Sequence, residues 1–203
     1  MRTRFDFPGL IPMVIVLGAL ACATKDARWV NEHLELSENF HAGTKVLETP
    51  PIPDTGAHRA WLRATGRTRG PRRGADIELA VRAEFEDFSF LDRVSFASGR
   101  AYPLTVVKRE NEDCGTTDIS LCNVHEDVSV RLSRKFLIAK RATGFHVKLW
   151  GRRESVVLFV PPEYIEGLIS RMENREPRPI EALKAAPPAS VPAAADPAAS
   201  ARR

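Results

Sequence analysis

The chain is poor in the residues that mark enzymes and metalloproteins. It has three cysteines and five histidines, and no two histidines stand at the spacing of an H-E-x-x-H site. No serine lies in a G-x-S-x-G turn, and no glycine-rich loop ends in the Lys-Ser/Thr pair that cradles phosphate. A catalytic group assembled from distant positions would leave no such motif. The sequence therefore predicts no catalytic residue, no metal site and no cofactor, and an enzyme is the less favoured class.

Long apolar runs are also scarce, because the only one is Leu10–Ala21, close behind Arg2 and Arg4. A bilayer-spanning helix needs roughly 20 apolar residues, and this shorter run also contains Pro12. A basic start, an apolar stretch and small residues at its end are the layout of a secretory signal peptide. We therefore predict that residues 1–21 are a signal peptide that is removed on export.

The end of this segment allows two interpretations. Ala19-Leu20-Ala21 fits the A-x-A site of the general signal peptidase. Gly18-Ala19-Leu20-Ala21-Cys22 also resembles a bacterial lipobox, in which the cysteine is lipidated and becomes the new N-terminus. The resemblance implies a bacterial envelope lipoprotein anchored through Cys22. Ala23 in the next position would then imply sorting to the periplasmic face of the outer membrane.

The two remaining cysteines, Cys114 and Cys122, form an even number in an oxidising compartment, which predicts one disulfide. His125 lies close by, so thiolates and an imidazole would also be available to zinc. A fourth ligand at a familiar spacing is missing. The disulfide is the prediction, and a metal site is the alternative.

Charge is modest overall but unevenly distributed. The formal net charge is +4, yet no acid lies between Asp54 and Asp76. This stretch is rich in guanidinium groups, whose fork geometry matches phosphate and carboxylate oxygens. The candidates for an anionic ligand are Arg59, Arg63, Arg67, Arg69, Arg72 and Arg73. The alternative is a solvated segment whose arginines pair with acids elsewhere, and export argues against a nucleic-acid partner.

Composition divides the chain into four segments. After the signal peptide, residues 22–57 form a lipidated N-terminus and a tether, because prolines near 50–53 favour an extended chain. Within this span, order over 28–37 remains open. Residues 58–174 form one globular β-rich domain. Residues 175–203 become rich in alanine and proline and are predicted to be a disordered tail.

Alternating apolar and polar residues predict strands through most of the globular segment. The expected strands are 76–86, 91–97, 101–108, 124–132, 145–150 and 155–160, with a hairpin between the last two. Ser133 begins a short predicted helix, and Pro162 starts a second one with an apolar stripe. These patterns predict an α+β fold, mainly antiparallel β as a sandwich or partial barrel, with one or two short covering helices.

The functional prediction follows from the predicted export and lipid anchor more than from any catalytic or binding motif. We predict a lipid-anchored envelope protein that acts as a non-catalytic binding module or as an assembly or accessory subunit. The alternative is an envelope hydrolase that acts on cell-wall or surface polymers through a scattered site. Expected partners are the membrane itself, through the anchor, and envelope proteins, anionic lipids or polysaccharides.

Overall fold

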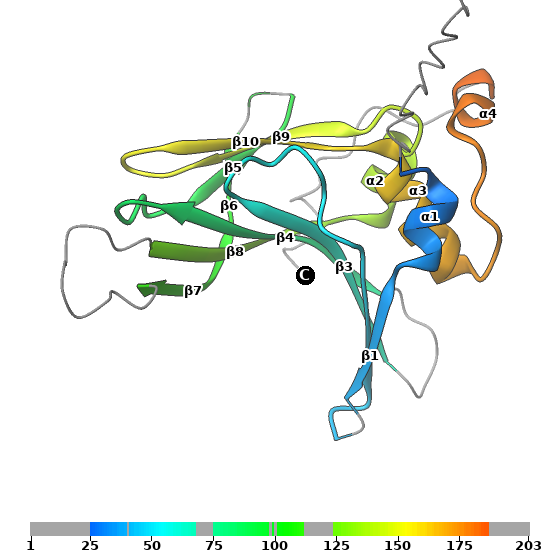
Figure 1. The fold of residues 1–203 in the computed structure, drawn as a ribbon, viewed down its shortest axis with the longest axis horizontal. Helices are drawn as coiled ribbons and strands as arrows, with labels where there is room; N and C mark the ends of the chain where they lie inside the picture. The colour runs from blue at the N-terminus through cyan, green and yellow to red at the C-terminus, as the bar shows by residue number, and fades with distance from the viewer. Residues whose placement is uncertain are drawn as a thin grey trace, which may run out of the picture.

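The computed structural model describes residues 25–39, 41–67, 75–97, 99, 101–111 and 124–186, which form two antiparallel sheets with helices at one end (Figure 1). The six-stranded sheet consists, in spatial order, of β1 (Glu35–Asn39), β2 (Thr44–Glu48), β3 (Arg59–Arg67), β4 (Asp76–Phe85), β8 (Val124–Leu132) and β7 (Thr105–Asn111). The four-stranded sheet consists of β10 (Ser155–Val160), β9 (Phe145–Trp150), β5 (Arg93–Ser95) and β6 (Ala101–Pro103). The predicted fold class, mainly antiparallel β with a few short helices, is confirmed.

One residue carries the chain from one sheet to the other. Only Leu104 separates β6, at the edge of the four-stranded sheet, from β7, at the edge of the six-stranded sheet. A single strand had been predicted over 101–108, and the structure divides it into these two. The chain therefore joins an edge strand of one sheet to an edge strand of the other, and the sandwich resembles a partial barrel along that side.

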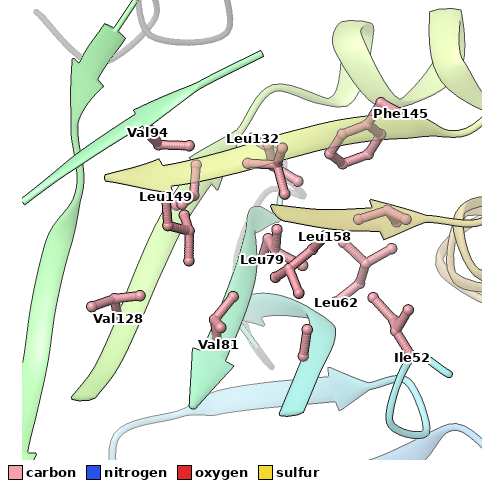
Figure 2. Packing of buried hydrophobic residues seen from close by; sticks show 14 of the residues in the cluster. Ile52, Leu62, Leu79, Val81, Val94, Val128, Leu132, Phe145, Leu149 and Leu158 are labelled. Carbon is pink, nitrogen blue, oxygen red and sulfur yellow. The ribbon is translucent and has the colours of Figure 1, made fainter. Parts of the chain in front are cut away.

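The core lies between the sheets, where their apolar side chains meet (Figure 2). In β4 and β10 alternate residues are buried, as the period of two requires. Figure 2 shows Leu79 and Val81 of the six-stranded sheet directed toward Leu149 and Leu158 of the four-stranded sheet. These strands therefore have one face in the core and one face outside the sandwich, whereas β1, β2 and β7 bury no residue.

A buried carboxylate also connects the two sheets. Glu126 of β8 is fully buried and accepts hydrogen bonds from the backbone amides of Phe90 and Leu91, at 2.7 and 2.8 Å. Nε of Arg109, on β7, donates to the same carboxylate at 3.2 Å. Because residues 90 and 91 lead directly into β5, this contact fixes the start of the four-stranded sheet against the six-stranded one.

Four short helices gather at one end of the sandwich (Figure 1): α1 (Ala27–Glu32), α2 (Arg134–Lys140), α3 (Pro162–Glu173) and α4 (Ile180–Ala185). The side chain of Ser133 caps α2 by accepting from the amide of Phe136, and Pro162 is the first residue of α3, both as predicted. α1 packs closely on α3, where Asn31 Nδ2 donates to the carbonyl of Gly167 at 3.0 Å. In the part of the chain that the structure describes, no helix is long and apolar enough to cross a membrane.

The predicted tether over 22–57 needs correction, because the first helix of the fold begins within it, at Ala27. Asp26 caps α1, and β2 pairs with β3 along five residues, so this part of the chain belongs to the domain. The hairpin of β1 and β2 projects away from the helices (Figure 1). Its residues are mostly exposed or half-buried, and a strand with so little burial leaves a weak alternating pattern in the sequence.

The predicted start of the disordered tail at residue 175 is also too early. Arg175 Nη1 donates to Glu166 at 2.7 Å, and the amide of Arg178 donates to the same carboxylate oxygen at 3.0 Å. Ile180 and Leu183 of α4 are buried. Polar contacts of this kind leave no periodic signal, so composition alone placed the boundary wrongly. Residues 187–203 lie outside the described residues, as does the signal peptide.

Candidate functional site

The predicted arginine cluster is only partly described. Arg59, Arg63 and Arg67 lie on β3 at every fourth residue, so all three side chains leave the outer face of the six-stranded sheet. Arg69, Arg72 and Arg73 lie outside the described residues. The structure therefore brings three of the six candidates onto one face.

Most charges on this face are paired with neighbours across the strands. Arg63 forms ion pairs with Glu48 of β2 and Glu78 of β4, each directly opposite it in the ladder. We call this surface the charged face, defined by Glu48, Arg59, Arg63, Arg67, Glu78, Arg82 and Asp127. For Arg63 the pairing supports the alternative of arginines that are neutralised within the domain.

Arg82 and Asp127 provide the best-formed pair on the charged face. Two of the three guanidinium nitrogens of Arg82, Nε and Nη2, donate to the two oxygens of Asp127, each at 2.8 Å. The hydrogen bonds from Arg82 hold the pKa of Asp127 below its ordinary value, and the pKa of Arg82 is raised in turn. Such forked pairs fix geometry as well as charge. Arg59 and Arg67 are exposed, and neither takes part in an ion pair with a described residue.

The opposite outer surface, on the four-stranded sheet, has a different character. In β10 the inward residues are buried, whereas Val157 and Phe159 point out and keep 61% and 40% of their surface exposed. We call this surface the aromatic face, defined by its outward residues Arg93, His146, Lys148, Trp150, Val157 and Phe159. In the described strands of this sheet, no outward position holds an acid.

The Phe159 ring on the aromatic face occupies space that a glycine beneath it leaves open. Its ring is centred 4.7 Å from that of His146, its partner in the β9–β10 ladder. Gly144 has a φ of 68°, and a Cβ there would lie 2.7 Å from the Phe159 ring and 2.5 Å from the carbonyl of Val160. Glycine at position 144 therefore both ends the turn after α2 and makes space for the aromatic ring.

Trp150 is held in a single orientation at the other end of β9. Its indole Nε1 donates to Ser95 Oγ on the neighbouring strand β5 at 2.8 Å. The ammonium of Lys148 lies 3.6 Å from the ring centroid, a cation–π contact. Arg93, directly opposite Trp150 in the ladder, forms a solvent-exposed ion pair with Asp92. The face thus combines ordered aromatic rings with positive charge.

The helical end contains a cavity of about 710 Å³, lined in part by Lys25, Asp26, Glu163 and Tyr164. Its carboxylates serve the helices, since Asp26 caps α1 and Glu163 stands in the first turn of α3. The hydroxyl of Tyr164 donates to the carbonyl of Pro51 at 3.1 Å, and burial raises the pKa of Tyr164. These contacts give Asp26, Glu163 and Tyr164 structural roles that need no substrate.

A second cavity of about 440 Å³ is lined by Ser170 and Arg175, beside the buried Glu166. Burial alone would raise the pKa of Glu166, but hydrogen bonds from Arg175 and Arg178 outweigh it and lower that pKa. Glu166 and Ser170 are both fully buried. A carboxylate held ionised by arginine and closed to solvent is suited to fastening the C-terminal segment, not to transferring a proton to a ligand.

Several predicted residues cannot be placed. Cys22, Cys114 and Cys122 lie outside the described residues, so the anchor and the disulfide remain predictions. The ladder between β7 and β8 pairs Asn111 with Val124, which brings the two ends of the cysteine-bearing segment together. Within the described ranges, no group of three or more His, Asp or Glu side chains is arranged to hold a metal ion.

The aromatic face was missed in the sequence because Val156–Val160 is an uninterrupted apolar run. Such a run predicts a strand but does not show which of its residues leave the core. The signal that was present lies in the partner strand, where His146, Lys148 and Trp150 alternate with buried residues. Comparisons with protein-family models, with curated proteins and with solved structures give no match for this chain.

Proposed function

We propose that this chain is an exported protein of the bacterial envelope, anchored by lipid on Cys22, and that it acts as a non-catalytic binding module through the aromatic face. The observation that carries the binding role is the exposure of Val157 and Phe159 on a face whose outward positions lack acids. The signal peptide and the lipobox-like Gly18–Cys22 support export and anchoring in the envelope.

Single exposed apolar residues are ordinary in soluble proteins. The aromatic face differs because its apolar residues are contiguous on two paired strands and are held in fixed orientations by the Trp150–Ser95 and His146–Phe159 contacts. Contiguous apolar patches rimmed by polar groups commonly mark interaction sites. A rigid aromatic surface also loses little conformational entropy when it is covered.

The binding role is tested by a photo-crosslinking amino acid placed at position 157 in the full chain, expressed in a bacterial host. The matched control places the same amino acid at Val107 of β7, which is 64% exposed on the other sheet. We expect adducts from position 157 and none, or far fewer, from position 107. Equal adducts from both positions would contradict a dedicated binding face.

The lipid anchor on Cys22 is tested separately, by the intact mass of the protein purified from membranes. We expect a chain that begins at Cys22 and carries added acyl mass, and Cys22→Ser should remain unprocessed or appear in the soluble fraction. An unmodified chain that begins at Cys22 would contradict the anchor while leaving the aromatic face as a binding surface for a soluble partner.

The hydrolase alternative would place its chemistry in the larger cavity, where Asp54 and Glu163 contribute carboxylates. Asp54→Asn and Glu163→Gln should leave a binding module unaffected in the crosslinking assay. Turnover of a cell-wall polymer by the purified protein that is lost in either variant would favour the enzyme.

A further inference from the structure

We propose that the occupant of the aromatic face is the membrane itself: the face docks on the anionic leaflet that holds the lipid of Cys22, so that the domain lies against the bilayer. This inference rests on the proposed function for the anchor and for the face, and it names the partner of that face. The reach of the anchor, the place where the chain enters the fold and the chemistry of the face all support it.

The first step is the short reach between the anchor and the fold. Two residues separate Cys22 from Lys25, and Asp26 already caps α1. Three residue steps span at most about 11 Å, even in a fully extended chain. A lipid on Cys22 therefore brings the start of α1 close to the headgroups, and one side of the domain must meet the bilayer.

The second step is the position of that starting point. Lys25 and Ala27 line the same cavity as Pro161, which follows β10 directly. α1 also packs along α3, with the carbonyl of Ala27 close to Gly167. The chain therefore enters the fold beside the end of β10 that carries Phe159, and Figure 1 shows α1 next to this end of the four-stranded sheet. The start of α1 and the Phe159 end of the aromatic face therefore lie at the same end of the molecule.

The third step is chemical complementarity. Val157 and Phe159 supply apolar surface, and Trp150 is a residue favoured at membrane interfaces. Lys148 supplies positive charge that no described acid pairs, whereas Arg93 is paired with Asp92. The outward positions of these strands hold no acid that an anionic headgroup would repel. The charged face also holds positive charge, on Arg59 and Arg67, but Glu48, Glu78 and Asp127 stand among its arginines and would repel anionic headgroups. It lies on the opposite side of the sandwich.

A partner protein is the other class of occupant, and the mass of the adducts at position 157 separates a protein from a lipid in the crosslinking experiment above. A protein would need an apolar patch bordered by an acid to match Lys148. It would also have to reach a face that the short anchor holds at the bilayer surface. The membrane needs no such arrangement, because the anchor already places it there.

The test uses the chain from residue 22 onward with Cys22→Ser, which retains every described helix and strand but carries no lipid. Its sedimentation is measured with phosphatidylcholine vesicles that contain, or lack, phosphatidylglycerol. We expect binding to the anionic vesicles only, weakened by salt. Lys148→Gln should lower the partition coefficient about fivefold, the effect of one basic residue near an anionic surface.

Two further variants decide between the faces. Val157→Ser with Phe159→Ser should reduce the partition at least as much as Lys148→Gln, with an unchanged circular dichroism spectrum as evidence of folding. Arg59→Gln with Arg67→Gln, on the charged face, should leave the partition within about twofold of the unsubstituted protein. Failure of the anionic vesicles to bind, or loss only in the Arg59 and Arg67 variant, would overturn the inference.

Failure here is distinguishable from failure of the proposed function. If Cys22 carries lipid and position 157 crosslinks to a protein but vesicles do not bind, the binding module stands and the membrane is not its partner. If vesicles bind but Cys22 is unmodified, docking on the membrane stands and the anchor is wrong.

Discussion

The charged face and the aromatic face are built on the same plan and differ in how their side chains are satisfied. Both are the outward sides of antiparallel strands whose inward sides form the core. On the charged face, Glu48, Arg63 and Glu78 stand side by side on three strands and pair with one another. On the aromatic face, Val157 and Phe159 keep 61% and 40% of their surface exposed, although the Phe159 ring contacts His146 and lies over Gly144.

This difference shows why a cluster of arginines in a sequence is weak evidence for an anionic ligand. Residues 59–73 contain no acid, so the stretch is strongly basic when read along the chain. Acids from β2, β4 and β8 then stand beside these arginines in the folded sheet or beside their neighbours. Lys148 is a single charge in the sequence, yet its ammonium takes part in no ion pair with a described residue. Spatial neighbours, not local density, decide which charge is available.

The largest effect is expected when the contact between the two sheets, made by the buried carboxylate of Glu126, is removed. Glu126→Ala removes the acceptor for two backbone amides and for Arg109, and buried groups are then left unpaired. We expect a loss of about 3–5 kcal/mol in the free energy of unfolding, measured by urea denaturation. Glu126→Gln, which keeps one acceptor oxygen, should lose less. An Ala variant within about 1 kcal/mol of the unsubstituted protein would contradict the role of this carboxylate.

A pair of glycines tests whether the aromatic face is shaped by its backbone. At Gly144 a Cβ would overlap the carbonyl of Val160 and the Phe159 ring, and the φ of 68° disfavours any side chain. Gly144→Ala should therefore cost about 2–3 kcal/mol. Gly66→Ala, on β3, is the matched control because nothing lies within 4 Å of its added Cβ. Thermal denaturation of both variants should show a lower midpoint for the first and little change for the second.

The Arg82–Asp127 pair on the charged face should make the free energy of unfolding depend on pH. The pKa of Asp127 is lowered by its hydrogen bonds with Arg82, so folding is stabilised while Asp127 is ionised. This contribution is fully present above the unfolded pKa of about 4 and is lost as the pH falls through the lower folded pKa. Asp127→Asn should cost about 1 kcal/mol at neutral pH, because the pair is partly exposed. The difference between the two proteins should shrink below about pH 4, and a constant difference would exclude this pair as its cause.

The smallest effect on stability is expected on the aromatic face. Val157→Ser with Phe159→Ser removes side chains that lie outside the core cluster, so the free energy of unfolding should change by about 0.5 kcal/mol or less. The matched core substitution Leu158→Ala, one residue away and buried, should cost about 2–5 kcal/mol. If the two exposed residues proved as costly as Leu158, they would be part of the core and not a surface kept for a partner.

Much of the fold was predictable where each residue's own pattern agrees with its final environment. The predicted bounds of β8, β9 and β10 coincide with the observed ones, because these strands alternate or are continuously apolar between clear breaks. Ser133 and Pro162 are local signals that act through the backbone of their own helices, so they are readable without the rest of the molecule.

The unpredicted parts depend on neighbours that are distant in the sequence. β2 becomes a strand by pairing with β3, and the C-terminal segment is held by Glu166 of α3. The break at Leu104 arises because β6 and β7 find partners in different sheets. The candidate site was unpredictable for the same reason, since exposure of Val157 and Phe159 is decided by which side of β10 the six-stranded sheet covers.

The alternation of β10 has a consequence for how such a protein can evolve. Positions 155, 157 and 159 of β10 point outward, and the other three residues of the strand, Val156, Leu158 and Val160, belong to the core. Mutation can therefore rewrite the outward positions with little penalty to folding, while the inward ones stay constrained. Descendants of one ancestral domain could acquire different partners through this strand and keep the same scaffold. Selection for binding and selection for stable folding would therefore act on alternate residues of the same short strand.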